Sequence, residues 1–290
     1  MKVDSHSLFS WRRIPVSLQA IIAGFLVAAI TTNIWLLLLL NLGVGAAAVA
    51  ESLFLALFLW WAHGGGPPRS AKVARANAFR SVALPPGQWL WGLIAAVSFA
   101  ATVHASIVLL FRFVSYPEAA FRHGYDLSFI PSQNLRWVVV VISAASAAVC
   151  EESGFRGFMQ QPIEQRHGVK VAVVISSFFF MSLHLTKAWA LFGMVPIIFG
   201  VGMLLGFLAW SAGSLIPGMI GHFVMDVGLF AYWWTGIAGS FHARPITESG
   251  VDRAFVIACF VFAVSLTFVL LAILRLRNGS MAHPGNSRCR

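Results

Sequence analysis

The sequence predicts a single-domain, all-α polytopic membrane protein, and three observations lead to that prediction. Of the 290 residues, 59% are hydrophobic and only 10% are charged, whereas a soluble domain carries about 25% charged residues. The mean hydropathy is +0.81, and the apolar residues form long runs of the length that a membrane-crossing helix requires. The 11 Trp and 25 Phe suit interfacial aromatic belts and packing against lipid.

About eight apolar segments can be drawn as transmembrane helices. They lie near residues 15–40, 46–63, 89–111, 137–160, 171–188, 193–211, 214–236 and 254–274. The first segment is too long for the core of a signal peptide, so we expect it to remain as a membrane helix. We divide the chain into N-terminal membrane helices with a basic loop (1–136), a helical core that holds the candidate catalytic residues (137–236), and a last helix with a polar, basic tail (237–290).

The distribution of positive charge orients these helices. The net charge is +10, and an N-terminus in the cytoplasm places 14 of the 20 basic residues in cytoplasmic segments. The positive-inside rule then predicts a multi-pass membrane protein with both termini cytoplasmic. The expected location is a bacterial-type cell membrane. The basic stretch after Gly64-Gly-Gly-Pro-Pro68 is expected to lie on anionic lipid headgroups. The charge is therefore interpreted as loop charge, and a nucleic-acid partner is not expected.

Two polar residues in apolar segments, Cys150 and Glu51, are weaker candidates for a catalytic role. Cys150, Cys259 and Cys289 are far apart and give neither a disulfide framework nor a zinc-finger spacing. Cys150 adjoins two carboxylates and is a candidate nucleophile, but nothing in the neighbouring sequence is placed to activate its thiol. Glu51 lies early in the second segment and is interpreted as an interfacial residue at a helix end.

The strongest chemical signal is a cluster of charges at the end of the apolar run that begins at Trp137. A charged side chain at bilayer depth costs about 2.5–3.5 kcal/mol and needs a partner or a function. On a helix, Glu152 and Arg156 are four residues apart and face each other, whereas Glu151 is turned about 100° away. Glu151, left without a partner, suits a general base. The alternative is a charge cluster at a helix end on the membrane surface.

A second signal is His184, which follows Phe180 by one helical turn. Glu151 and His184 are 33 residues apart, and the midpoint of that interval is His167-Gly168, a turn sequence. An antiparallel hairpin about this turn would carry both side chains about 24 Å from it, near the middle of the membrane. Phe180 would then shield or orient the imidazole. The alternative is that His184 is a hydrogen-bonded packing residue.

A third signal is His222 and Asp226, which share one helical face and in which the carboxylate can orient the imidazole. Together with Glu151 and His184 they can activate water. Either the histidines and a carboxylate hold a divalent metal such as zinc, or Glu151 deprotonates water directly while the histidines stabilise the oxyanion. The H-E-x-x-H pattern is absent, and the cofactor stays open.

Three short motifs resemble those of the CAAX-protease and bacteriocin-processing (CPBP, or Abi) family of intramembrane proteases, to which the Ras-converting CAAX prenyl endopeptidase belongs. They are Glu151-Glu152-x-x-x-Arg156, Phe180-x-x-x-His184 and His222-x-x-x-Asp226. The resemblance covers about residues 137–230. It implies a helical membrane core open toward the cytoplasm and hydrolysis of a peptide bond.

The resemblance also implies roles for individual residues. Glu151 would be the base, His184 and His222 would form the water or oxyanion site, and any bound metal would lie on these two histidines. Glu152, Arg156 and Phe180 would be supporting residues. The prenyl-protein protease has Asn where this chain has Asp226, so the substrate, a peptide or a protein with or without a lipid, is left open.

The leading hypothesis is therefore an intramembrane endopeptidase reached from the cytoplasmic leaflet, with a peptide or protein substrate and membrane lipid as partners. A proton-coupled transporter would also explain buried Glu, His and Asp side chains. A non-catalytic membrane scaffold would retain the motifs as structural pairs.

Overall fold

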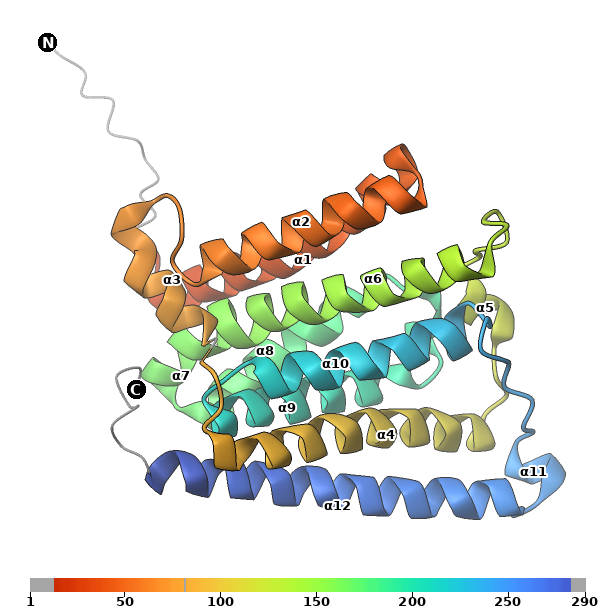
Figure 1. Ribbon diagram of the computed structural model, residues 1–290. Helices are drawn as coiled ribbons and strands as arrows, with labels where there is room; N and C mark the ends of the chain where they lie inside the picture. The colour runs from red at the N-terminus through yellow and green to blue at the C-terminus, as the bar shows by residue number, and fades with distance from the viewer. Residues whose placement is uncertain (1–12, 81, 283–290) are drawn as a thin grey trace, which may run out of the picture.

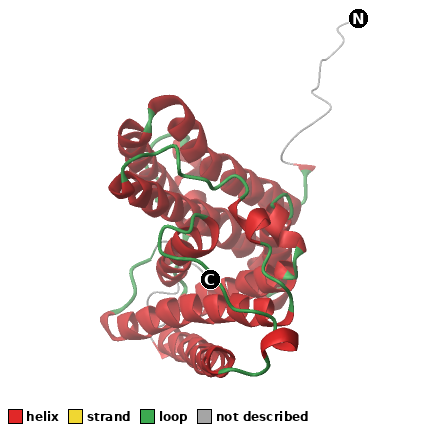
Figure 2. Ribbon diagram, turned by 90° about the vertical axis from the view of Figure 1, so that its right-hand side faces the viewer, coloured by secondary structure: helices red, strands yellow, loops and turns green. Residues whose placement is uncertain are grey.

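The computed structural model describes residues 13–80 and 82–282, and all regular structure in that part of the chain is helical (Figures 1 and 2). The predictions for the N-terminus before Arg13, for Cys289 and for the polar tail beyond Ala282 lie outside the described residues. The long helices are α1 (Val16–Leu42), α2 (Val44–Ala62), α4 (Trp89–Phe113), α6 (Gln133–Glu151), α9 (Met194–Ala212) and α12 (Arg253–Ala282). The shorter α-helices are α3 (Lys72–Phe79), α5 (Glu118–Arg122), α7 (Gln161–His167), α8 (Val169–His184), α10 (Ile216–Gly228) and α11 (Ile246–Ser249).

The predicted all-α membrane fold is confirmed. Six of the described helices are long and apolar enough to cross a membrane, and α8 is a shorter apolar helix of 16 residues. The predicted segment 214–236 corresponds to α10, of 13 residues, continued by the π-helical turn η6 (Leu229–Trp234). The count of eight crossings therefore stays a prediction.

The helices lie side by side as layers (Figure 1). The α1–α2 hairpin forms one edge, α4 and α12 form the opposite edge, and α6, α8, α9 and α10 lie between them. The start of α1, α3, α7 and the end of α12 gather at one end of the bundle, and α5 and α11 lie at the other. We call these the α3–α7 end and the α5–α11 end.

A long helical stretch brings the charge cluster to the centre of this bundle. It runs from Gln133 to His167 and contains a π-helical segment, η4 (Glu152–Gln160), between α6 and α7. π-helical segments are rare and are frequently found at functional sites. The predicted turn at His167-Gly168 is confirmed, since α7 ends at His167 and Gly168 has φ +81°. This left-handed conformation is one that glycine adopts without strain.

Close helix contacts hold η4 in place. A methyl group added at Gly24 of α1 would lie 2.5 Å from the carbonyl oxygen of Gly154 in η4, so the two backbones are nearly in contact. On α9, a methyl group at Gly202 would lie 2.8 Å from Cβ of Ser177 in α8. Small residues at these positions allow the helices to approach without a layer of side chains between them.

The interpretation of Glu51 as an interfacial residue is wrong. Its side chain is fully buried, and Ser146 Oγ of α6 donates a hydrogen bond of 2.7 Å to its Oε1. Although Glu51 lies early in α2, the packing of α2 on α6 covers it completely.

The basic stretch at residues 69–80 is only partly a surface feature. Arg75 is buried and donates hydrogen bonds to the carbonyl oxygens of Gly65 and Pro68, at 2.8 Å each. Arg75 therefore holds the preceding loop in place. Arg69 and Lys72 are exposed and remain available to lipid headgroups.

At the α5–α11 end, a buried arginine ties α4 to the start of α12. Arg112 is 1% exposed, and its Nη1 lies 2.8 Å from Oδ2 of Asp252. The backbone N–H of Phe255 donates to Oδ1 of Asp252 at 2.8 Å. These two donors, chiefly the backbone N–H of Phe255, hold the pKa of Asp252 below its ordinary value of 3.8.

Candidate active site

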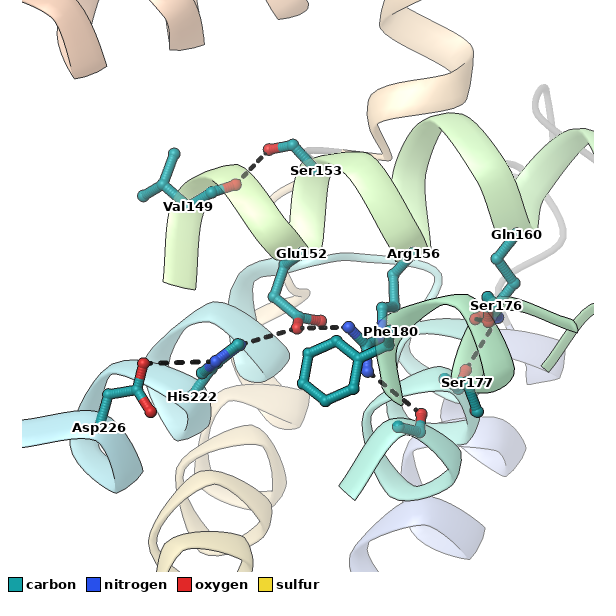
Figure 3. Close-up of polar contacts among 12 residues, drawn as sticks. Val149, Glu152, Ser153, Arg156, Gln160, Ser176, Ser177, Phe180, His222 and Asp226 are labelled. Atoms are coloured by element: carbon teal, nitrogen blue, oxygen red, sulfur yellow. Dashed lines mark hydrogen bonds and ion pairs between the residues drawn. The ribbon is translucent and has the colours of Figure 1, made fainter. Parts of the chain in front are cut away.

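Glu152 lies between two other buried polar groups and contacts both of them (Figure 3). Its Oε1 lies 3.0 Å from Nη1 of Arg156 and 2.9 Å from Nδ1 of His222, and both Glu152 and Arg156 are fully buried. The predicted pairing of Glu152 with Arg156 is confirmed. The contact with His222 is new, and it makes one carboxylate the partner of both a guanidinium and an imidazole.

The chain of charges continues to Asp226. Its Oδ2 lies 3.4 Å from Nε2 of His222, which confirms that the two side chains share one face of α10. His222 is thus flanked by a carboxylate at each ring nitrogen, one from η4 and one from its own helix (Figure 3). This arrangement fixes the plane of the imidazole and favours positive charge on it.

Arg156 is held by more than its ion pair. Its Nη2 donates to the carbonyl oxygen of Gly202 at 3.3 Å, and its guanidinium carbon lies 4.4 Å from the centre of the Phe180 ring. A guanidinium above an aromatic face is attracted by the negative charge density of the ring. The glycine at position 202 brings the backbone of α9 close enough to serve as the acceptor.

His184 lies at the end of α8 and is partly exposed. Its Nδ1 is 2.8 Å from the carbonyl oxygen of Phe180, which can only accept a hydrogen bond, so Nδ1 carries a proton. In the neutral ring, Nε2 then has a free lone pair. The Phe180 ring centre is 4.8 Å from that of His184 and 6.0 Å from that of His222. Phe180 therefore packs between the two imidazoles, in agreement with an orienting role.

Glu151 is buried but is not part of this chain. Its carboxylate makes no hydrogen bond within residues 13–80 and 82–282, although it interacts electrostatically with His222 and Arg156. No hydrogen bond or ion pair joins it to His184 in the same part of the chain. The structure thus brings His184, His222 and Asp226 together, attaches Glu152 to His222, and leaves Glu151 nearby with a free carboxylate.

A small cavity adjoins these groups. Its volume is about 40 Å³, which is room for about three or four water molecules at about 10–15 Å³ each. Its polar lining is His184, His222 and Asp226, and the rest of its wall is apolar or aromatic. A water molecule in this cavity would meet two imidazoles and a carboxylate.

The donor set does not match a metal site as it stands. Among the described residues, no three His, Cys, Asp or Glu side chains are grouped so that they could hold a metal ion. Nδ1 of His222 is engaged by Glu152, and Nδ1 of His184 by a backbone carbonyl. The two histidines are a partial set, and we derive no step through a metal.

The sequence interpretation missed three residues at the site. Trp189 and Trp234 line the cavity, and the carbonyl oxygen of Gly202 supports Arg156. All tryptophans were assigned to membrane interfaces or lipid packing, so the two that line the cavity were not recognised. The carbonyl oxygens of Gly202 and Gly206 both accept hydrogen bonds from side chains of η4.

Comparison with known proteins agrees with the motifs. Residues 132–228 match a family model described as Rce1-like, type II CAAX prenyl endopeptidase Rce1-like. This confirms the resemblance to the CAAX-protease family for the segment that carries all three motifs. No curated protein and no solved structure matched the chain. With its six apolar helices, the chain is an integral multi-pass membrane protein that carries a protease-type core, and a protease core implies a peptide or protein substrate.

Proposed function

We propose that the protein is an intramembrane endopeptidase in which Glu151 activates water for attack on a peptide carbonyl. The observation that carries the proposal is the cavity in which His184, His222 and Asp226 meet inside an otherwise apolar wall. Three polar side chains from two helices around a space of water size are costly to maintain in a membrane protein without a function. Glu151 does not line the cavity, but its carboxylate interacts electrostatically with His222 and its Oε2 has no hydrogen-bond partner within the described chain.

The proposed first step forms the bond between water oxygen and the carbonyl carbon. Glu151 takes one proton from water, and Nε2 of His184, with its lone pair free, accepts a hydrogen bond from the same water. The carbonyl electron pair moves onto oxygen, and His222, flanked by Glu152 and Asp226, supplies positive potential to this oxyanion.

The second step breaks the peptide bond. The carbonyl reforms as the C–N bond cleaves, and the proton held by Glu151 passes to the leaving nitrogen. The products are a carboxyl and an amino terminus. In this scheme Glu152 and Asp226 position His222, and Arg156 balances the charge of Glu152.

The setting we propose is a bacterial-type cell membrane with both termini in the cytoplasm. The exposed Arg69 and Lys72 at the α3–α7 end would contact anionic headgroups, each adding about 1 kcal/mol of attraction. The substrate is a peptide or protein that reaches membrane depth, with or without a lipid.

The test compares protein termini in membranes that contain wild-type protein, Glu151→Gln or the matched control Glu118→Gln. Glu118 is an exposed carboxylate on α5 and does not line the cavity. We expect cleavage products in wild type and in Glu118→Gln, and a loss of about 10²–10⁴ in rate for Glu151→Gln, the range that general-base catalysis supplies. Gel filtration and a melting curve check that Glu151→Gln is folded. Retained cleavage by folded Glu151→Gln would remove Glu151 from the role of base.

A further inference from the structure

The cavity lies on one side of the buried charge chain, the series of ion pairs that runs from Arg156 through Glu152 and His222 to Asp226. In α10 and η6, its lining begins at His222 and continues through Asp226 to Trp234. In α8 and the loop that follows, it continues from His184 to Trp189. Both paths run away from the α3–α7 end and toward the α5–α11 end, as the order of helices in Figure 1 shows.

The opposite side of the charge chain is closed. Arg156 and Gln160 are fully buried, and each donates to a backbone carbonyl of α9, Arg156 to Gly202 and Gln160 to Gly206. Ser176 Oγ of α8 donates to Oε1 of Gln160 at 3.3 Å. These hydrogen bonds join η4, α8 and α9 into a polar seal between the cavity and the α3–α7 end (Figure 3).

The two ends of the bundle differ in charge. Among the described residues, the α3–α7 end carries nine basic residues and one acidic residue, whereas the α5–α11 end carries six basic and four acidic residues. The basic residues of the α3–α7 end are Arg13, Arg69, Lys72, Arg75, Arg80, Arg166, Lys170, Arg275 and Arg277, and its acidic residue is Glu164. The positive-inside rule places the α3–α7 end in the cytoplasm.

The wall between the cavity and the α5–α11 end is aromatic and contains an unpaired hydrogen-bond donor. Trp189 and Trp234 stack with ring centres 5.4 Å apart, and Tyr125 stacks on Trp234 at 5.0 Å. The indole N–H of Trp189 interacts with the hydroxyl group of Tyr125, whereas the buried indole N–H of Trp234 makes no hydrogen bond within the described chain. Buried donors are normally paired, so the N–H of Trp234 indicates an external acceptor. The carbonyl oxygens of an extended peptide are acceptors of this kind.

From these observations we propose that the substrate enters from the α5–α11 end, past Trp189 and Trp234, and is therefore an extracytoplasmic peptide segment next to the membrane. The substrate class rests on the proposed endopeptidase function, whereas the direction of access does not. The sequence predicted access from the cytoplasmic leaflet. Access from that side does not agree with the polar seal, which lies between the cavity and the α3–α7 end.

Cysteine accessibility tests the direction without requiring catalysis. The full-length protein would carry Cys150→Ala, Cys259→Ser and Cys289→Ser as background. Ile197→Cys introduces a thiol into the cavity wall, and Leu205→Cys places one further along α9, where the native side chain is fully buried. The exposed positions Thr186→Cys and Lys170→Cys report the α5–α11 and α3–α7 ends, respectively.

Intact cells and inside-out vesicles would be treated with a charged, membrane-impermeant methanethiosulfonate. We expect Thr186→Cys and Ile197→Cys to react in intact cells, Lys170→Cys only in inside-out vesicles, and Leu205→Cys in neither. The proposal is overturned if Ile197→Cys reacts from the side of Lys170→Cys, or from neither side.

The map of cleaved termini gives the second measurement. Products lost in Glu151→Gln should have their cleavage sites in extracytoplasmic segments close to a membrane anchor. Cleavage sites in cytoplasmic segments would contradict the proposal even if Glu151 is the base. Conversely, cleavage that persists in Glu151→Gln would refute the catalytic role and leave the accessibility result standing.

Discussion

Replacement of Arg156 by Met should strongly destabilise the protein. Met is similar in length and apolar, so it fills much of the space of the arginine side chain but removes the positive charge. Glu152 would then keep its negative charge in a fully buried position, with His222 as its remaining partner. The contacts of Arg156 with the Gly202 carbonyl and the Phe180 ring would also be lost.

The magnitude follows from the burial of the pair. Both side chains are 0% exposed, and removing one partner of such a pair costs about 3–5 kcal/mol. At about 2–4 °C per kcal/mol for a chain of this size class, the melting temperature should fall by about 6–20 °C. Arg156→Lys should lie between Met and wild type, because an ammonium retains charge but cannot reproduce the planar contacts.

The assay is thermal unfolding of purified protein in detergent, followed by tryptophan fluorescence. Arg166→Met on α7 is a matched control, since Arg166 is exposed, and it should change stability by less than about 0.5 kcal/mol. Glu152→Gln in the Arg156→Met background removes the uncompensated charge, so the double variant should be more stable than the sum of the single effects. Additive losses, or an Arg156→Met melting temperature within error of the control, would refute the argument.

Three further predictions concern helix packing and the bundle ends. Gly24→Ala should destabilise the protein by about 1–3 kcal/mol, because the added methyl group overlaps the Gly154 carbonyl; an unchanged melting temperature would contradict the close contact. Glu51→Ala should cost about 1–3 kcal/mol, as Ser146 Oγ loses its buried acceptor, while Glu51→Gln retains an acceptor and most of the stability; equal losses would show that the hydrogen bond is unimportant. Since the pKa of Asp252 is held below 3.8, its contribution to stability is present above that pH and is lost as pH falls further. The difference between wild type and Asp252→Asn in melting curves should therefore shrink below about pH 4, and a pH-independent difference would contradict this.

Features that depend on local spacing could be predicted from the sequence. The i, i+4 pairs of Glu152 with Arg156 and of His222 with Asp226 follow from helix geometry alone, and both are present. The turn at Gly168 followed from turn chemistry at the midpoint of a hairpin. Long apolar runs likewise predicted the helical membrane fold, because the bilayer admits few alternatives.

Features that depend on partners far apart in the chain could not be predicted. Glu51 is buried by Ser146, which lies 95 residues away, and helix position alone suggested the membrane surface. The contact between Glu152 and His222 spans 70 residues. The amino-acid composition did not predict the π-helical segment η4, which packs against α1 and α8. The proposed direction of access rests on the hydrogen bonds of Arg156 and Gln160 to α9, and these partners are known only after the helices are placed.

The adjacent carboxylates Glu151 and Glu152 have different roles in the proposed chemistry: Glu151 is the base, and Glu152 orients His222. A general base must be free to accept a proton, and Glu152 already shares Oε1 with Arg156 and His222. Protonation of Glu152 would weaken both contacts at once, so its charge serves better to orient the imidazole. Glu151 has no such commitments within the described chain, and a proton on it breaks no hydrogen bond. Because one residue along a helix turns the side chain by about 100°, two neighbouring acids can take opposite roles, one fixed and one reactive.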